Sequence, residues 1–294
     1  MARTSTSRRE SSGGRWRKTG RSPVATVLTY TVLGLLSVVF LVPFYIIVRN
    51  SMMNTDQVTS LNWSWLPSPA TFSNYRDLFN DPSLPFGHAL WNSLVIAVIT
   101  APVATMLGSM AGYALARIDV PFRGAITVFI VGTLMIPASV TFVPTFLVVD
   151  ALGGVNTRWG IIAPGLFNAF SVVLFRSFYQ RFPPDLEEAG RIDGLGYLGV
   201  YARIALPNSI TMIASLGALS FIESWNAFLW PLVIGQDPSS WTAQIALSTF
   251  LTSQTINLPG LFAGAVVTIV PLALMFLVAQ RFIVQGITAS GLKD

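Results

Sequence analysis

The sequence predicts an all-α, polytopic membrane protein with six transmembrane helices and both termini on the cytoplasmic side. Of its 294 residues, 52% are hydrophobic and only 11% are charged, and the mean hydropathy is +0.61. Soluble globular proteins average about a quarter charged residues. The apolar residues gather in long runs without Asp, Glu, Lys or Arg, and the basic residues gather between alternate runs. These observations exclude an ordinary soluble fold.

Residues 1–22 are expected to form a disordered basic arm in the cytoplasm. Seven of the 18 basic residues lie in the first 21 positions, where Glu10 is the single acid. The arm is rich in Ser, Thr and Gly and precedes an apolar run, which favours the positive-inside rule over nucleic-acid binding. No small-residue cleavage pattern follows that run, so we interpret it as a retained first span and not as a signal peptide.

Six intervals are expected to cross the membrane. A bilayer core about 30 Å thick requires about 20 residues at a rise of 1.5 Å each. The expected spans are residues 22–48, 84–116, 124–149, 159–175, 204–222 and about 261–280. The fourth has only 17 residues and contains Pro164, so it is expected to extend through Ser177 and Phe178. The spans also contain prolines at positions 43, 102, 137, 144 and 271, which are expected to kink helices.

The distribution of positive charge predicts the orientation. With six spans both termini share one side, and 15 of the 18 Lys and Arg residues fall on that side. Arg49, Arg76 and Arg158 fall on the other side. The positive-inside rule therefore places both termini in the cytoplasm, including a C-terminal tail at 284–294. The 40-residue segment 49–88 is then external, and its Trp and Pro content predicts a turn-rich cap instead of a long helix.

One cytoplasmic segment, residues 183–207, has a distinctive pattern. Three acids follow Pro184 within four residues, and proline with nearby acids is typical of a helix N-terminus. Gly194 and Gly196 then interrupt the helix, and residues 197–203 can resume it in a new direction. The pattern predicts a short helix, a glycine bend and a second short helix, which together form a protruding knob. An ordinary loop on the membrane surface explains these features equally well.

The same segment resembles the signature loop of bacterial ABC-importer permeases. The loop's pattern is Glu-Ala-Ala, three residues, Gly, nine residues and Ile-x-Leu-Pro. The matching positions are Glu188, Ala189, Gly194, Ile204, Leu206 and Pro207. Gly190 replaces the usual second alanine, which lowers helix propensity by about 1 kcal/mol. The resemblance implies that these residues, together with Asp193, dock onto a separate ATPase, with Glu188 as the polar link.

Four further stretches are similar to the maltose-type carbohydrate importers of that family: residues 92–94, 111–117, 225–231 and 280–288. The final Asp294 departs from a common terminal glycine, and the basic arm is not part of the resemblance. The resemblance implies a type I ABC-importer permease fold over residues 23–283 and import of a mono- or oligosaccharide across the bacterial cell membrane. Polyols and glycerol phosphates are the alternative solutes. The implied partners are membrane lipid, a homologous second permease, two ATPase subunits and an external solute-binding protein.

The chain itself is not expected to be an enzyme or to hold a cofactor. No Gly-x-x-x-x-Gly-Lys-Ser/Thr stretch occurs, and the lysines are Lys18 and Lys293. Without such a loop and lysine the chain lacks the usual cradle for ATP phosphates, so ATP and Mg²⁺ are expected on the partner ATPase. Cysteine is absent, and the sole histidine, His88, lies in the external segment, so the sequence suggests no metal or general-base site.

The end of the fifth span supplies the candidate solute pathway. Glu223 is an ionisable residue near a span interior, which by default indicates function. Trp225, Asn226 and Phe228 join it, because an aromatic face and an amide suit the CH face and hydroxyls of a sugar. Packing of this segment against the partner permease is the alternative interpretation. An ion-coupled transporter also requires ionisable groups in its spans, but that class leaves the signature loop unexplained.

Overall fold

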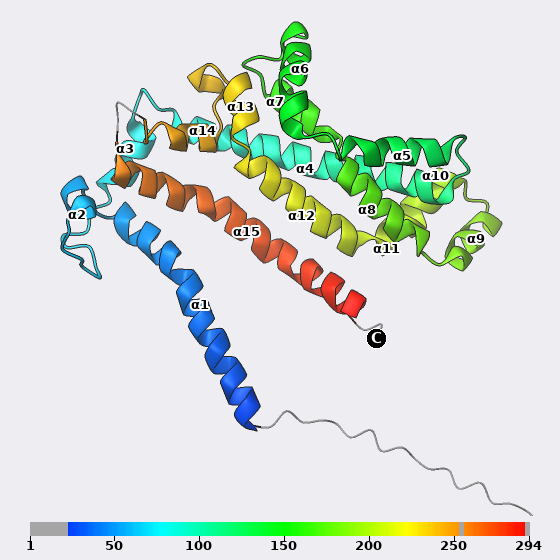
Figure 1. Cartoon of the computed structure of the whole chain (residues 1–294), viewed down its shortest axis with the longest axis horizontal. Coiled ribbons are helices and arrows are strands. Elements are labelled where there is room, and N and C mark those ends of the chain that lie inside the picture. The colour runs from blue at the N-terminus through cyan, green and yellow to red at the C-terminus, as the bar shows by residue number, and fades with distance from the viewer. Residues whose placement is uncertain (1–22, 253–255, 292–294) are drawn as a thin grey trace, which may run out of the picture. The chain divides into compact units, whose positions relative to one another are not determined.

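The structure, a computed structural model, describes residues 23–252 and 256–291 and is almost entirely helical over those ranges (Figure 1). Its contacts divide the chain into two compact units, residues 1–46 and 47–294. The first helix, α1 (Pro23–Ser51), runs across this division and is the first apolar span. The expected basic arm at 1–22 lies outside the described residues, as do residues 292–294 of the expected tail.

Four helical segments in the described part of the chain are long and apolar enough to cross a membrane. They are α1, α4 (Phe86–Arg117), residues Arg158–Gln180, and residues Leu258–Phe282 of α15 (Leu258–Gly291). The segment Arg158–Gln180 joins α7 (Arg158–Ile162), a 3-10 turn η1 (Ala163–Leu166) and α8 (Ala169–Gln180). It includes Ser177 and Phe178, so the expected extension of the fourth span is confirmed.

Two further spans are bent. Helices α5 (Arg123–Thr133) and α6 (Ala138–Ala151) meet at 99°, and the segment Tyr197–Asn208 meets α12 (Ile210–Asn226) at 78°. With each bent pair counted as one span, the described residues contain six candidate spans, the number that the sequence predicts.

The kink expected at Pro137 in the third span, residues 124–149, is a complete break of the helix. The chain breaks at residues 134–137, and Pro137 stands before the first residue of α6 with an extended ψ of 135°. Proline has no backbone N–H and disfavours helical geometry in the residue before it, so the helix ends there instead of bending gently. Within the bent fifth span, the long helix begins later than the expected Ile204: α12 starts at Ile210, after a π-helical turn and the 78° bend.

The remaining helices are short. Helices α2 (Thr55–Thr59) and α3 (Ser73–Asn80) lie in segment 49–88, which confirms a turn-rich cap without a long helix. Between α12 and α15 come α13 (Leu229–Ile234), a 3-10 turn η3 (Pro238–Ser240) and α14 (Ala243–Ser248). Within 23–252 and 256–291 the only β-type pairing is an isolated bridge between Leu251 and Ile256.

Helix α4 forms the centre of the second unit. It packs against α8 and α12, and α12 packs in turn against α15 (Figure 1). Gly108 and Gly112 of α4 permit the close approach to α8: a Cβ on Gly112 would lie 2.5 Å from Phe175 Cβ and 2.7 Å from Arg176 N. Small residues four positions apart are the usual means by which helix backbones approach closely in membranes. The tight α4–α8 contact positions the loop that follows α8.

Candidate functional site

The segment after α8, here called the coupling loop (residues 183–207), forms two short helices joined by a glycine turn. Helix α9 (Pro184–Ile192) has proline at its first position and Asp185 and Glu187 in its first turn, as the sequence predicts. Glycine at position 194 has a φ of +84°, which confirms the left-handed bend. Leu195 N donates to Gly190 O at 3.0 Å and Gly194 N donates to Arg191 O at 3.0 Å. This pair of hydrogen bonds is a Schellman motif, which satisfies the last carbonyls of α9.

The second helix of the coupling loop continues directly toward α12. Helix α10 (Tyr197–Val200) is followed by a π-helical turn η2 (Tyr201–Ala205) and by α11 (Leu206–Asn208). Single π-helical turns are rare and occur often at functional sites. The coupling loop therefore leads, through a 78° bend at Ser209, into α12 of the fifth span.

A cluster of aromatic side chains fixes the coupling loop to the ends of α4 and α8. Tyr113, Tyr179 and Tyr201 are all buried, and the Tyr113 ring lies 5.3 Å from Tyr179 and 5.2 Å from Tyr201. Tyr201 OH donates to Ser109 Oγ at 3.0 Å, and Ser109 Oγ lies 2.8 Å from Tyr179 OH. Buried hydrogen-bonded networks of this kind hold one arrangement of the elements that supply them.

An ion pair fixes the start of α9. Arg117 Nε lies 3.2 Å from Glu187 Oε1, and both side chains are largely buried. Neither of these two atoms has an aligned hydrogen bond, so the contact is electrostatic, whereas Arg117 Nη2 donates to Phe182 O. Burial raises the pKa of Glu187, and the positive charges of Arg117 and Arg191 oppose this rise.

The structure divides the eight predicted docking residues into two groups. Glu188, Ala189, Asp193, Gly194 and Pro207 are exposed, whereas Gly190 is buried and Ile204 and Leu206 are half-buried against the tyrosine cluster. A Cβ on Gly190 would lie 2.4 Å from Ile204 Cδ1. The isoleucine methyl group thus occupies the space that the usual alanine would take. The first group forms a surface, and the second group anchors it.

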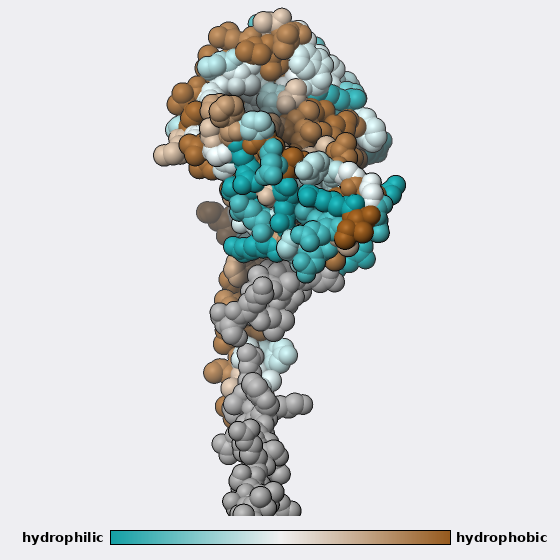
Figure 2. Space-filling view, turned by 90° about the vertical axis from the view of Figure 1, so that its right-hand side faces the viewer, coloured by the Kyte–Doolittle hydropathy of each residue, from teal (hydrophilic) through white to brown (hydrophobic). Residues whose placement is uncertain are grey.

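The exposed surface of the coupling loop is mixed in character. Ile192, Leu198 and Tyr197 expose 86%, 75% and 48% of their surface, next to Glu188 and Asp193. Figure 2 views the molecule from the side on which α9 and α10 lie in Figure 1, and hydrophilic side chains gather there around an isolated hydrophobic patch. An exposed hydrophobic patch that is rimmed by polar residues is a feature of protein-interaction sites.

Glu223, the first predicted pathway residue, lines a cavity of about 410 Å³. The cavity lies between α4, α12 and the turn η1, and Trp230 of α13 also lines it. We refer to it as the Glu223 cavity. Thr100, Asn168, Ser220 and Ser224 are its other polar lining residues.

The other three predicted pathway residues do not line that cavity. Trp225 is 1% exposed and stacks on Phe221 at 5.9 Å. Asn226 is exposed and accepts a hydrogen bond from Gln244 at 3.3 Å, and Phe228 is 37% exposed. Residues 220, 223 and 224 share one face of α12, whereas Trp225 lies on another face, which accounts for the separation.

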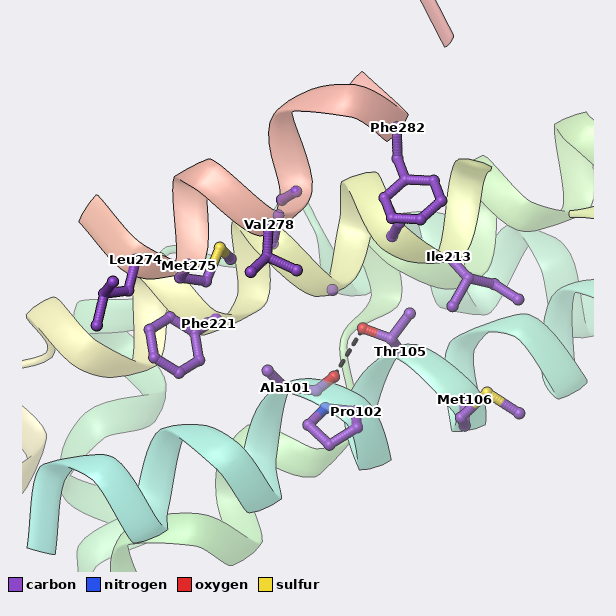
Figure 3. A pocket seen from close by; sticks show the side chains of 14 residues that line it. Ala101, Pro102, Thr105, Met106, Ile213, Phe221, Leu274, Met275, Val278 and Phe282 are labelled. Atoms are coloured by element: carbon purple, nitrogen blue, oxygen red, sulfur yellow. Dashed lines mark hydrogen bonds between the residues drawn. The ribbon is translucent and has the colours of Figure 1, made fainter. Parts of the chain in front are cut away.

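A second hollow, of about 550 Å³, is apolar (Figure 3). It lies between α4, α12 and α15, and Met106, Phe221 and Phe282 are among its lining residues. Among its described lining residues the one hydroxyl, on Thr105, donates to Ala101 O at 2.7 Å and is therefore already used. A hydroxyl-rich solute would lose its hydrogen bonds there, so this groove is unsuited to a sugar.

Sequence reasoning missed several residues that shape these sites. It selected Glu188 in the acid cluster, whereas Glu187 is the buried member that pairs with Arg117. The sequence does contain a signal that Glu187 faces inward: it is three residues from Gly190, so the two residues share one face of α9. No local pattern identifies Thr100 or Asn168, which reach the Glu223 cavity from separate elements.

Known proteins resemble this chain over most of its length. The family model described as "Binding-protein-dependent transport system inner membrane component" matches residues 104–289. The arabinooligosaccharides transport system permease protein AraQ of Halalkalibacterium halodurans is 35% identical over 230 residues, covering 77% of this chain and 81% of that protein. The sn-glycerol-3-phosphate transport system permease protein UgpE of Yersinia enterocolitica is 29% identical, covering 88% and 94%.

A solved structure extends the likeness to the whole fold. A chain of a bacterial ABC transporter involved in the import of the acidic polysaccharide alginate matches with a TM-score of 0.78. The match covers 88% of this chain and 96% of that chain at 22% sequence identity, so it shows a shared fold and nothing about the solute.

Proposed function

Because the chain belongs to the family of inner membrane components of binding-protein-dependent transport systems, we propose that it carries a carbohydrate into the cell as one of two related permease subunits. Transport is powered by a separate ATPase, and an external binding protein delivers the solute. The relative named for arabinooligosaccharides supports a saccharide. The relative named for glycerol 3-phosphate makes that anionic solute the second candidate.

The structure of the coupling loop supports the proposal that this loop docks onto the ATPase. Its exposed group, which includes Glu188, projects from a base held by the Arg117–Glu187 pair and the tyrosine cluster. Because the base is rigid, a movement of the ATPase that displaces α9 and α10 would also displace the fifth span, and would not be taken up by rearrangement of side chains. We assign the exposed group to the ATPase contact and the inner group to its support; the exposed group is Glu188, Ala189, Asp193, Gly194 and Pro207, and the inner group is Gly190, Ile204 and Leu206.

The orientation follows from the same proposal. The coupling loop faces the cytoplasm, where ATP is available, together with both termini. Segment 49–88 then faces the outside, toward the binding protein. The charge imbalance of 15 to 3 supports this orientation independently of the coupling loop.

Charge reversal at Glu188 tests the docking assignment. Glu188→Lys should reach the membrane in normal amounts but retain about ten-fold less ATPase on co-purification, because a buried like-charge contact costs at least the 1.4 kcal/mol that corresponds to that factor. Asp56→Lys is the matched control, since Asp56 is an exposed acid on a short helix of segment 49–88. Wild-type ATPase recovery with Glu188→Lys would place the contact elsewhere.

Uptake measurements in cells test the solute. Radiolabelled arabinooligosaccharides and glycerol 3-phosphate, the solutes named for the two relatives, are the first pair to compare. Accumulation of glycerol 3-phosphate without any saccharide uptake would overturn the carbohydrate assignment and leave the permease assignment intact.

A further inference from the structure

We propose that the Glu223 cavity is a subsite for a neutral, hydroxyl-rich solute and that Glu223 excludes anionic solutes from it. This inference rests on the proposed function only in treating the chain as a solute permease. It adds a residue-level reason why a neutral saccharide passes and a phosphate or uronate does not.

Three interruptions of helical backbone meet at this cavity. Ala138 follows the break between α5 and α6, Pro164 and Gly165 belong to the 3-10 turn η1, and Ala227 follows the end of α12. Non-helical backbone at membrane depth is tolerated only where it is buried in protein or lines a water-filled cavity. In transporters, such interruptions gather around the solute site. The breaks therefore indicate a solute cavity and not a packing defect.

The cavity offers unused hydrogen-bonding capacity. Thr100 is 6% exposed, and its Oγ1 has no hydrogen-bond partner within the described residues. A buried hydroxyl without a partner is costly, and a solute hydroxyl would relieve that cost. Ser220 and Ser224 add two hydroxyls on the same face of α12 as Glu223. The volume of about 410 Å³ is within the range of sites that hold small organic ligands.

An aromatic wall completes the site. Trp230 lines the cavity, and its Nε1 already donates to Gly160 O at 3.2 Å. The Phe142 ring lies 5.6 Å away at 90°, which fixes the orientation of the indole. With its polar atom occupied, Trp230 presents an apolar ring surface, while the hydroxyls lie elsewhere on the wall. This combination suits a sugar, which has both CH faces and hydroxyl edges.

The charge of the cavity decides between neutral and anionic solutes. Among the described residues that line it, Glu223 alone is charged. A carboxylate accepts hydrogen bonds from solute hydroxyls but repels a phosphate or carboxylate, and apolar walls strengthen this repulsion. The N-terminus of α8, which would attract an anion, is capped because Ser171 N donates to Asn168 Oδ1 at 3.0 Å.

Thiol labelling in this cysteine-free chain tests the proposal without knowledge of the solute. The Ser224→Cys variant, assembled with its partner subunits in membrane vesicles open to both sides, is treated with a cationic trimethylammonium or an anionic sulfonate methanethiosulfonate. Each rate is divided by the rate of the same reagent with the exposed Ser68→Cys variant. After this normalisation the cationic reagent should react with Ser224→Cys about ten-fold faster than the anionic reagent. A factor of about ten is the smallest rate increase typical of a cleft lined by charge of one sign. Adding Glu223→Gln should abolish this preference, and Glu223→Lys should reverse it.

Solute protection tests the chemical class. Maltose and arabinobiose, both neutral, should slow modification of Ser224→Cys, whereas glycerol 3-phosphate should not unless Glu223 is replaced by Lys. No reaction with either reagent, an unchanged ratio in Glu223→Gln, or protection by glycerol 3-phosphate alone would each overturn the inference. Recovery of the ATPase with the Ser224→Cys chain is measured in parallel, so failure of the subsite is distinguished from failure of the permease assembly.

Discussion

Arg117, the last residue of α4, places its guanidinium 3.2 Å from the carboxylate of Glu187 in the first turn of α9. The two residues are 70 positions apart in the sequence numbering, and their contact joins the end of a membrane span to the coupling loop. Both side chains are largely buried, so the pair positions α9 more firmly than an exposed ion pair would.

Removing one member of this pair should cost more than removing both. Arg117→Met leaves Glu187 as a buried charge without a partner, and we expect a loss of about 3 kcal/mol in the free energy of unfolding. The double variant Arg117→Met, Glu187→Leu should recover most of this loss, because it leaves no buried charge. Thermal unfolding of the purified chain in detergent measures both. Equal stability of the single and double variants would show that the pair is solvated and weak.

Acid should stabilise the coupling loop through Glu187. Burial raises the pKa of Glu187 above its ordinary 4.5, against the charges of Arg117 and Arg191. A carboxyl group with a higher pKa in the folded state binds its proton more tightly when folded. The resulting stabilisation is therefore complete below pH 4.5 and is lost as the pH rises through the folded-state pKa.

Comparison with Glu187→Gln isolates the pH-dependent stabilisation by Glu187, because this variant retains every other carboxyl group. The unfolding temperature of the wild type, relative to that of Glu187→Gln, should rise as the pH falls from neutrality toward 4.5. A difference that does not change with pH would mean that Glu187 titrates normally.

The coupling loop shows how far local sequence signals reach. Pro184, the following acids and Gly194 predict α9, its N-terminus and its left-handed end, and the structure has each of them. Those signals act within a few residues, so one sequence suffices to read them. The partnership of Glu187 with Arg117 depends on how α4 meets α9, which no local pattern contains.

The α4–α8 contact should be sensitive to a single methyl group. In Gly112→Ala the new Cβ would lie 2.7 Å from the backbone N of Arg176, which cannot move without shifting α8. We expect a loss of about 1–3 kcal/mol in stability, as for overpacked cores. Gly132→Ala is the control, since a Cβ there meets nothing within 4 Å and alanine favours the α5 helix. Thermal unfolding that ranks Gly112→Ala as the more stable variant would contradict this packing.

Single cysteines test the orientation. Ser68 and Ser239 are exposed, and both lie on the proposed external side. The Ser68→Cys and Ser239→Cys variants should react with an impermeant thiol reagent in intact cells. Ser12→Cys, in the arm outside the described residues, should react only after the membrane is permeabilised. Labelling of Ser12→Cys in intact cells would reverse the orientation.

The Glu223 cavity marks the limit of sequence-based prediction. Glu223 stands out because a charge in a span is unusual, and the structure places it at the cavity. Its neighbour Trp225 looks equally suitable in the sequence, yet it is buried against Phe221 on another face of α12. The break before Ala138 also helps to form the cavity. In the sequence it lies within the apolar run 124–149, where Pro137 suggests only a kink.

Gly194 should be required for its backbone conformation and not for its small size. Its φ is +84°, yet a Cβ there would meet nothing within 4 Å. Gly194→Val therefore meets no steric obstacle from neighbours, but it strains the backbone by about 1–3 kcal/mol and redirects α10.

Gly196→Val is the matched control, because Gly196 has a φ of −72° and equally open surroundings. ATPase recovery should fall with Gly194→Val, fall less with Gly194→Asn, since asparagine adopts positive φ more readily, and stay near wild type with Gly196→Val. Equal losses in the two valine variants would mean that bulk at the docking surface, and not the turn, governs coupling.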